Sequence, residues 1–199
     1  VFISDLHLDH SRPEIINLFL RFADEVAATA DTLYILGDFL EVWAGDDSPA
    51  GMVSTVFDKL VELEEVHGTK VRLMHGNRDF MIGDELAARC HFELIDDPYP
   101  TIIKGLNALL MHGDTLCTDD IAYQQARQLL RSEAFITDFL NRPLQERALI
   151  AAEYRKKSGE ATSLLAADIM DVVVDDLVSS VHVFGAGSIS GQQHTDTTD

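Results

Sequence analysis

The stretch Thr32-Leu33-Tyr34-Ile35-Leu36-Gly37-Asp38 decides the fold. Its first five residues are apolar or β-prone and predict a short strand, which ends at a glycine followed by a carboxylate. Two other apolar or β-prone runs also end at polar residues. Residues 1–4 precede Asp5, and residues 70–74 precede Gly76-Asn77-Arg78-Asp79. Because sites assemble at the carboxyl ends of strands in open α/β sheets, these polar residues are the first candidates for function.

Apolar residues at helical spacing separate the predicted strands. The predicted helices cover residues 13–27, 52–66 and 83–91, and Pro13 suits the first turn of the first helix. A hairpin is predicted over 101–104 and 108–111, and its second strand ends at His112-Gly113-Asp114. Strands that alternate with helices indicate an α/β protein built on a layered sheet.

The pattern changes between residues 119 and 170, where strand signals disappear. Asp119 and Asp120 open one predicted helix, Phe135 lies in a second, and Pro143 begins a third. We interpret this segment as a helical insertion over the sheet. A plain pair of packing helices is the alternative.

Composition limits the classes of function. The chain has 199 residues, of which 46% are apolar and 25% charged, as expected for one globular domain with a small insertion. A net charge of −19 disfavours general nucleic-acid binding, whereas clustered carboxylates attract divalent cations. No apolar run approaches the roughly 20 residues of a spanning helix. Cys90 and Cys117 are too few for a disulfide framework, so we expect reduced thiols and a cytosolic protein.

Four polar clusters, each following a predicted strand, suggest a metal site. They are Asp5-x-His7, Gly37-Asp38, Gly76-Asn77 and His112. Taken singly, each is more often a cap, a turn or a core histidine than a ligand. Together, their carboxylate, imidazole and amide groups suit Mn²⁺, Fe²⁺ or Zn²⁺ better than Ca²⁺ or Mg²⁺. A shared carboxylate would hold two ions about 3.5–4 Å apart, as in two-metal hydrolysis.

The ordered clusters resemble the motifs of the calcineurin-like metallophosphoesterases, which run D-x-H, G-D, G-N-H-[DE], H and G-H-x-H. Arg78 stands where most of that superfamily has histidine. The strings SDLHL, YILGDFLEVWAGDD, HGNRDFMIG, MHGDTLCTDD and IMDV are similar to the UDP-2,3-diacylglucosamine diphosphatase family of lipid A biosynthesis. This resemblance implies a four-layer αββα sandwich. It places the N-terminal part of the core in 1–118, a helical lid in 119–170, and a remnant of the core with an atypical tail in 171–199.

The resemblance also implies an activity. We expect Mn²⁺-dependent hydrolysis of the pyrophosphate bond of UDP-2,3-diacylglucosamine to UMP and 2,3-diacylglucosamine 1-phosphate (lipid X). Because that substrate carries two acyl chains, the family implies a peripheral protein at the cytoplasmic face of the bacterial inner membrane, with no nucleic-acid partner. Two alternatives stay open: another metallophosphoesterase acting on a phosphodiester or phosphate ester, and an inactive copy that keeps the fold.

Roles carried over from the family fall on particular residues. Asp5 and His7 would bind the first Mn²⁺ ion, Asp38 both ions, and Asn77 and His112 the second; these five are also the expected catalytic residues. The expected substrate contacts are Asn77, Arg78, Asp120, Ser158 and Thr162. Arg78 would add a permanent charge suited to pyrophosphate oxygens. The alternative for Arg78 is a surface pair with Asp79. Apolar residues of the predicted lid would line an acyl chamber or simply pack: Phe135, Phe139, Leu140, Leu144 and Ile150.

The closing Gly-His-x-His motif is absent from the sequence. One alignment puts Ala186 and Ser188 at the two histidine positions, whereas a shifted alignment puts His194 and Asp196 there. The composition of 183–199 is unlike a continuation of the family, so we expect a truncated or altered C-terminal part. Strands that the family places after this motif would then be missing, which would leave a sheet edge unpaired.

Overall fold

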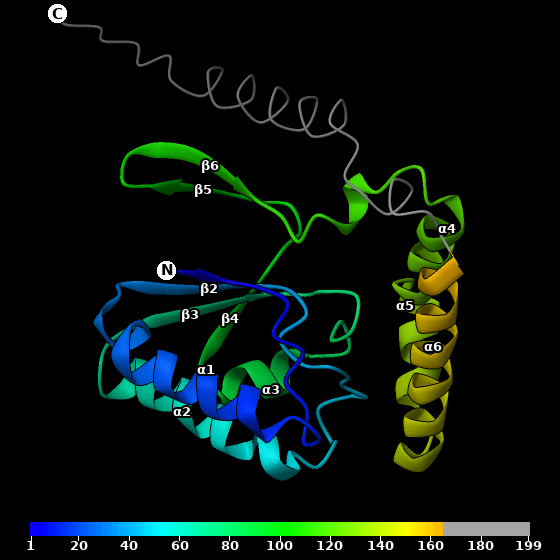
Figure 1. Cartoon of the computed structure of the whole chain (residues 1–199), viewed down its shortest axis with the longest axis horizontal. Coiled ribbons are helices and arrows are strands. Elements are labelled where there is room, and N and C mark those ends of the chain that lie inside the picture. Colours follow the sequence, from blue (N-terminus) through cyan, green and yellow to red (C-terminus); the bar gives the residue numbers. More distant parts are fainter. Residues whose placement is uncertain (165–199) are drawn as a thin grey trace, which may run out of the picture.

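The computed structural model describes residues 1–164. Its central sheet has four parallel strands in the order β1 (Phe2–Ile3), β2 (Thr32–Leu36), β3 (Lys70–Met74) and β4 (Phe92–Ile95) (Figure 1). Ile35 of β2 pairs with Ile3 on one side and Leu73 on the other. Because all four strands are parallel, their carboxyl ends lie along one edge of the sheet.

Three helices cover one face of this sheet: α1 (Pro13–Glu25), α2 (Ser54–Glu65) and α3 (Asp84–Arg89) (Figure 1). Pro13 occupies the first turn of α1, where its missing N–H costs no helical hydrogen bond. Phe19 of α1 and Leu60 of α2 are buried against Leu33 and Leu73 of the sheet. This helix–sheet interface is the main hydrophobic core of the described residues. Short 3-10 turns cover Ala27–Thr29, Gly51–Val53 and Asp114–Leu116.

A second, antiparallel layer lies over the opposite face of the sheet. It consists of β5 (Tyr99–Ile103) and β6 (Leu106–Leu110), and Tyr99 pairs with Leu110. These two residues pack against Tyr34 and Met74 of the central sheet. Residues 1–164 therefore supply three layers, namely helices, parallel sheet and hairpin, of the four layers expected from the family resemblance.

Three further helices stand beside the strand-end loops: α4 (Ile121–Leu130), α5 (Glu133–Leu140) and α6 (Leu144–Leu164) (Figure 1). The side chain of Asp120 caps α4, because its Oδ1 accepts a hydrogen bond from the Tyr123 amide at 2.9 Å. Ser132 caps α5 in the same way. The prediction of consecutive helices after Asp119 is confirmed as far as the description extends.

The predicted elements agree closely with the structure, with two differences. The strands over 32–36 and 70–74, the long N-terminal helices and the hairpin are confirmed. Strand β4 was not predicted, and α3 is shorter than the expected 83–91. The expectations for 171–199, and those for Ala186, Ser188, His194 and Asp196 within it, concern residues outside the described part. Among the described helices, none combines the length and hydrophobicity needed to cross a bilayer.

Candidate metal centre and adjoining cavity

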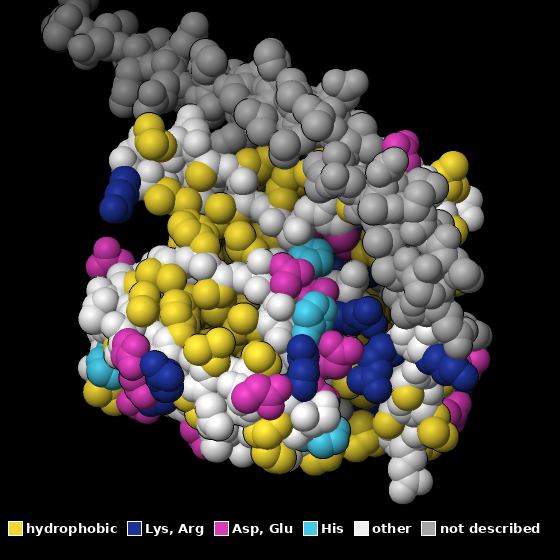
Figure 2. All heavy atoms as spheres, viewed as in Figure 1, with side chains coloured by type: hydrophobic (Ala, Val, Ile, Leu, Met, Phe, Trp, Pro, Cys, Tyr) yellow, Lys and Arg dark blue, Asp and Glu magenta, His cyan; other side chains and the backbone are white. Residues whose placement is uncertain are grey.

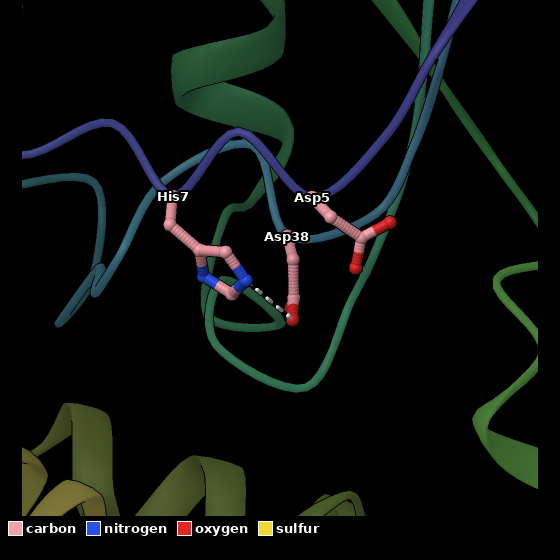
Figure 3. Close-up of side chains that lie close together, drawn as sticks. All are labelled: Asp5, His7 and Asp38. Atoms are coloured by element: carbon pink, nitrogen blue, oxygen red, sulfur yellow. Dashed lines mark ion pairs between the residues drawn. The ribbon is translucent and has the colours of Figure 1, made fainter. Parts of the chain in front are cut away.

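Asp5, His7 and Asp38 each offer a ligand atom, and these atoms all lie within 4.8 Å of one another. Asp5 and His7 follow β1, and Asp38 follows β2, so two neighbouring loops carry the cluster (Figure 3). The His7 ring is turned toward Asp38, with Nε2 at 3.6 Å from Oδ2 (Figure 3). The expected grouping of these three residues at strand ends is confirmed.

The backbone of this cluster is held in a conformation that residues other than glycine rarely adopt. Asp5, His7 and Asp38 have φ values of 56°, 48° and 51°, in the left-handed region. The loops are joined by hydrogen bonds from the Asp5 amide to the Gly37 carbonyl at 3.1 Å and from the His7 amide to the Asp38 carbonyl at 2.9 Å. Strain of this kind concentrates at functional sites, where the surrounding structure fixes it.

Asp38 is the buried member of the cluster, with 3% of its surface exposed. Burial raises the pKa of its carboxyl group above the ordinary value, against the opposing effects of the Arg78 amide and of His112. Its Oδ1 accepts a hydrogen bond from that amide at 2.9 Å. A divalent cation would supply the positive charge that this buried carboxylate needs, so the residues present fit a metal ion.

Two glycines allow the strand-end loops to approach closely. A Cβ on Gly76 would lie 2.7 Å from Cγ of Asp38, and closer still to its backbone nitrogen. A Cβ on Gly37, which has a φ of 92°, would lie 2.9 Å from Cγ of His112. Both distances are too short for a real side chain. The glycines of the sequence motifs therefore make room for the neighbouring ligand candidates.

His112 adjoins the cluster with its ring orientation fixed. Its Nδ1 lies 3.0 Å from the Leu36 carbonyl oxygen. Because a carbonyl only accepts, Nδ1 carries the proton of the neutral ring and Nε2 keeps a free lone pair. Histidines that bind metals are usually oriented by such a second contact. The position of His112 therefore suits the predicted ligand role.

Asp79 joins the loops from inside the protein. Its carboxylate accepts hydrogen bonds from the amides of Phe39 at 2.8 Å, Leu40 at 3.3 Å and Gly76 at 2.8 Å. The residue is fully buried. The alternative interpretation of Arg78 and Asp79 as a surface ion pair is therefore wrong, because Asp79 instead fixes the backbone on either side of Asp38.

A cavity of about 580 Å³ separates these loops from α4, α5 and α6. Three of the predicted substrate contacts, Asn77, Arg78 and Asp120, line it. Much of the remaining wall is apolar: Val42, Trp43, Phe80, Met81, Ala122, Ala126, Leu130, Phe135, Phe139 and Ala151. Figure 2 shows acidic, basic and histidine side chains gathered between the sheet domain and these helices.

The other residues predicted to contact the substrate differ in their position relative to the cavity. Phe135 and Phe139 line the cavity, whereas Leu140, Leu144 and Ile150 are not part of its lining. Ser158 and Thr162 fall on α6, but their side chains lie outside the described part.

Sequence reasoning missed a polar network between the fourth motif and α4. Oδ2 of the buried Asp114 accepts hydrogen bonds from the Tyr123 hydroxyl at 2.6 Å and from Arg127 Nε at 2.8 Å. Burial and the bond to Asp114 raise the pKa of Tyr123 above its usual range. Arg131 donates to the Gly76 carbonyl at 2.8 Å. In the sequence, the available sign of this network was the carboxylate of Asp114, which follows directly after His112-Gly113.

These features define an α/β protein with a candidate cation centre at its strand ends and a largely apolar cavity beside it. A relative from Hahella chejuensis, named UDP-2,3-diacylglucosamine hydrolase, is 45% identical over 93% of this chain and 75% of its own length. Relatives of the same name from Marinobacter nauticus and Pseudomonas paraeruginosa are 44% and 40% identical over 91% and 98% of this chain, and over 74% and 81% of their own lengths. The chain belongs to the UDP-2,3-diacylglucosamine hydrolase family.

Two further comparisons add little. No family model matches the chain. A crystal structure of a protein of unknown function from Aquifex aeolicus superimposes on 69% of this chain and 72% of its own, with a TM-score of 0.39 and 23% identity, which is too remote to bear on the fold.

Proposed function

We propose that this chain hydrolyses the pyrophosphate bond of UDP-2,3-diacylglucosamine, releasing UMP and 2,3-diacylglucosamine 1-phosphate for lipid A biosynthesis. The observation that supports the proposal is the cavity, which is lined by Asn77 and Arg78 and continues between apolar side chains of α4–α6. The backbone amide of Arg78 bonds Asp38 of the candidate cation centre at 2.9 Å. A substrate with a charged pyrophosphate and two acyl chains has the same division into polar and apolar parts.

The residues that would hold two Mn²⁺ ions are Asp5 and His7 for one, Asn77 and His112 for the other, and Asp38 between them. The ions would supply Lewis acidity and lower the pKa of an attacking water. The chain's own contribution is to fix these side chains. The hydrogen bonds of Asp79 and of His112 Nδ1 hold the loops and the imidazole in place before substrate arrives.

Arg78 and the apolar wall of the cavity would bind different parts of the substrate. A guanidinium stays ionised and can bond two phosphate oxygens at once, so Arg78 suits the pyrophosphate. Phe135, Phe139 and Trp43 would contact the acyl chains and exclude water. Asp120, Ser158 and Thr162 are proposed sugar contacts. We propose that α4–α6 act as the lid of this site, and that the complete fold is the four-layer sandwich.

A lipid substrate requires access to a membrane surface. Ile121, Leu129 and Leu149 lie on α4 and α6 and expose 65%, 61% and 73% of their surface. Large apolar side chains on helices of this kind favour adsorption to the interface of a bilayer. We therefore propose peripheral binding at the cytoplasmic face of the inner membrane.

The test is UMP release from UDP-2,3-diacylglucosamine by the full chain, with Mn²⁺ and with a chelator. We expect turnover that requires Mn²⁺ and that falls by at least two orders of magnitude in Asp38→Asn. Asp58→Asn, on the exposed side of α2, is the matched control and should retain full activity.

The absence of Gly-His-x-His favours a second candidate, an inactive copy that keeps the fold. Bound Mn²⁺ without UMP release would support that candidate and contradict the proposed activity. Cleavage of simple phosphodiesters at a higher kcat/KM than the lipid substrate would instead indicate another metallophosphoesterase.

A further inference from the structure

We infer that Asp46 is a positioning residue that holds the Trp43 indole in the wall of the cavity, and that it thereby sets the affinity for the apolar part of the substrate. This role rests on the proposed function, because it takes the cavity to receive the acyl chains. Asp46 is not part of the cavity lining, so its effect on a ligand passes through Trp43.

Both oxygens of the Asp46 carboxylate bind the start of helix α3. Oδ1 accepts a hydrogen bond from the Gly83 amide at 3.0 Å, and Oδ2 accepts one from the Leu86 amide at 2.9 Å. The N-cap residue of α3 is Gly83, which has no side chain that could accept these bonds, so Asp46 supplies the cap from another loop. With one amide on each oxygen, the carboxylate is fixed in a single orientation.

The Trp43 indole is held at its nitrogen by this fixed carboxylate. Nε1 donates to Asp46 Oδ1 at 3.2 Å, and it is the only polar group of the ring. The indole also packs edge to face against Phe57, with ring centroids 5.5 Å apart and an interplanar angle of 88°. Because Trp43 is only 5% exposed, rotation of the ring would leave a buried donor unpaired as well as lose this aromatic contact.

The loop that carries Trp43 lies between α3 and α6 (Figure 1). Asp46 attaches it to α3, and Arg147 of α6 donates to the Ala44 carbonyl, one residue after Trp43. Trp43 lines the cavity from this loop. A ligand binds more tightly to a wall that is already in place, because a loose side chain must be ordered at a cost in free energy. Loss of the bond between Asp46 and Trp43 should therefore weaken the binding of an apolar ligand group.

The first measurement uses Trp43 as the only tryptophan of the chain. Its emission wavelength and its quenching by acrylamide are recorded on the full chain, without metal or substrate. In Asp46→Ala, the emission should move to longer wavelength and the quenching should increase, because the indole is released from its buried position. Emission and quenching that equal those of the wild type would overturn the inference.

Asp46→Asn is the matched variant that separates Trp43 from α3. An amide oxygen in the place of Oδ1 keeps the bonds from Trp43 and Gly83. The NH₂ group then replaces Oδ2, so only the bond from Leu86 is lost. This variant should therefore have the emission and quenching of the wild type. Equal changes in Asp46→Asn and Asp46→Ala would mean that Asp46 only caps α3, and would also overturn the inference.

The second measurement is the binding of 2,3-diacylglucosamine 1-phosphate, the proposed lipid product, by titration calorimetry. The Kd should rise about 5-fold or more in Asp46→Ala, as expected when a buried donor loses its partner, and should stay unchanged in Asp46→Asn. Trp43→Phe has no N–H to hold, so Asp46→Ala should add little further loss in that background. The same loss in both backgrounds would show that Asp46 does not act through the indole, which would overturn the inference.

Failure of the proposed function has a different signature. A wild-type chain that neither binds this lipid nor releases UMP would contradict the proposed function. The fluorescence of Trp43 would still decide whether Asp46 positions the indole, because that measurement requires neither metal nor lipid.

Discussion

The carboxylate of Asp79 bonds the backbone amide of Phe39 at 2.8 Å, across 40 residues of sequence. The same side chain also accepts from Gly76, so a single buried carboxylate ties the loop after β2 to the loop after β3. Asp38 and Asn77, the proposed ligands of these loops, each lie one residue from an amide that Asp79 binds. The geometry of the cation centre thus depends on a residue that does not line the cavity.

Asp79→Asn should destabilise the protein. One carboxylate oxygen becomes an NH₂ group facing backbone donors, so at least one of its three hydrogen bonds is lost in a fully buried position. Leaving a buried donor unpaired costs about 1–3 kcal/mol. The free energy of unfolding in urea should fall by that amount, whereas Asp58→Asn on exposed α2 should stay within about 0.5 kcal/mol of wild type. An unchanged unfolding midpoint in Asp79→Asn would contradict this account.

Gly76→Ala should damage the cation centre through its volume. The new Cβ would meet Asp38, both its backbone nitrogen and its carboxylate, and neither group can move without shifting the ligand loop. We expect a loss of about 1–3 kcal/mol in the free energy of unfolding, together with weaker Mn²⁺ binding.

Gly105→Ala separates steric conflict from backbone strain. Gly105 has a φ of 81°, and no atom lies within 4 Å of the position that a Cβ would take. The substitution should therefore lower the free energy of unfolding by about 1 kcal/mol through backbone strain alone. Titration calorimetry should show unchanged Mn²⁺ affinity for that variant. Weakened metal binding in Gly105→Ala, or unaltered binding in Gly76→Ala, would show that close packing against Asp38 does not control the site.

Local patterns predicted the elements that have strong local signals. Strands β2 and β3 were predicted to the residue, because each is an apolar run bounded by turn residues. Strand β4 was missed because Phe-Glu-Leu-Ile is short and alternates weakly. This segment is a strand because it pairs with β3, and that pairing cannot be read from the local sequence.

The candidate site shows the same division. The ligand types and their order along the chain predicted the grouping of Asp5, His7 and Asp38. The left-handed conformation of all three residues was not predictable, since non-glycine residues disfavour it unless tertiary contacts impose it. The contacts of Asp79, Asp114 and Tyr123 join different motifs, and sequence spacing does not encode such pairs.

Cys90 should be chemically inert in the folded protein. It is 2% exposed, and burial raises the pKa of its thiol. The thiolate is the reactive form, so alkylation at pH 8 should be slow in the native state and rapid in urea. A Cys117→Ser variant leaves Cys90 as the only thiol and allows its modification to be followed by mass spectrometry.

The same shift has a consequence for stability at high pH. The unfolded thiol ionises at its ordinary pKa, before the folded one, so the unfolded state gains relative stability as pH rises through that value. The free energy of unfolding should therefore fall more steeply above about pH 8.5 in the protein with Cys90 than in Cys90→Ala. Native alkylation as fast as that of a free thiol would refute the buried position.

Arg147 should control the affinity of the cavity for the proposed lipid substrate. Its side chain is almost completely buried, and NH1 donates to the Ala44 carbonyl at 2.5 Å, while NH2 pairs with Asp47. This residue fastens α6 to the loop that carries Trp43, and one turn further along α6 Ala151 lines the cavity.

Arg147→Met keeps much of the side-chain volume but loses both contacts, so the wall formed by α6 should separate from the Trp43 loop. We expect KM for UDP-2,3-diacylglucosamine to rise about 10-fold with a much smaller change in kcat, because the two partners of Arg147, Ala44 and Asp47, do not belong to the cation centre. Asp47→Asn is the matched control: Asp47 is 64% exposed, and such a pair contributes at most about 1 kcal/mol. A fall in kcat at constant KM for Arg147→Met would show that α6 acts on the chemical step and not on the position of the lipid.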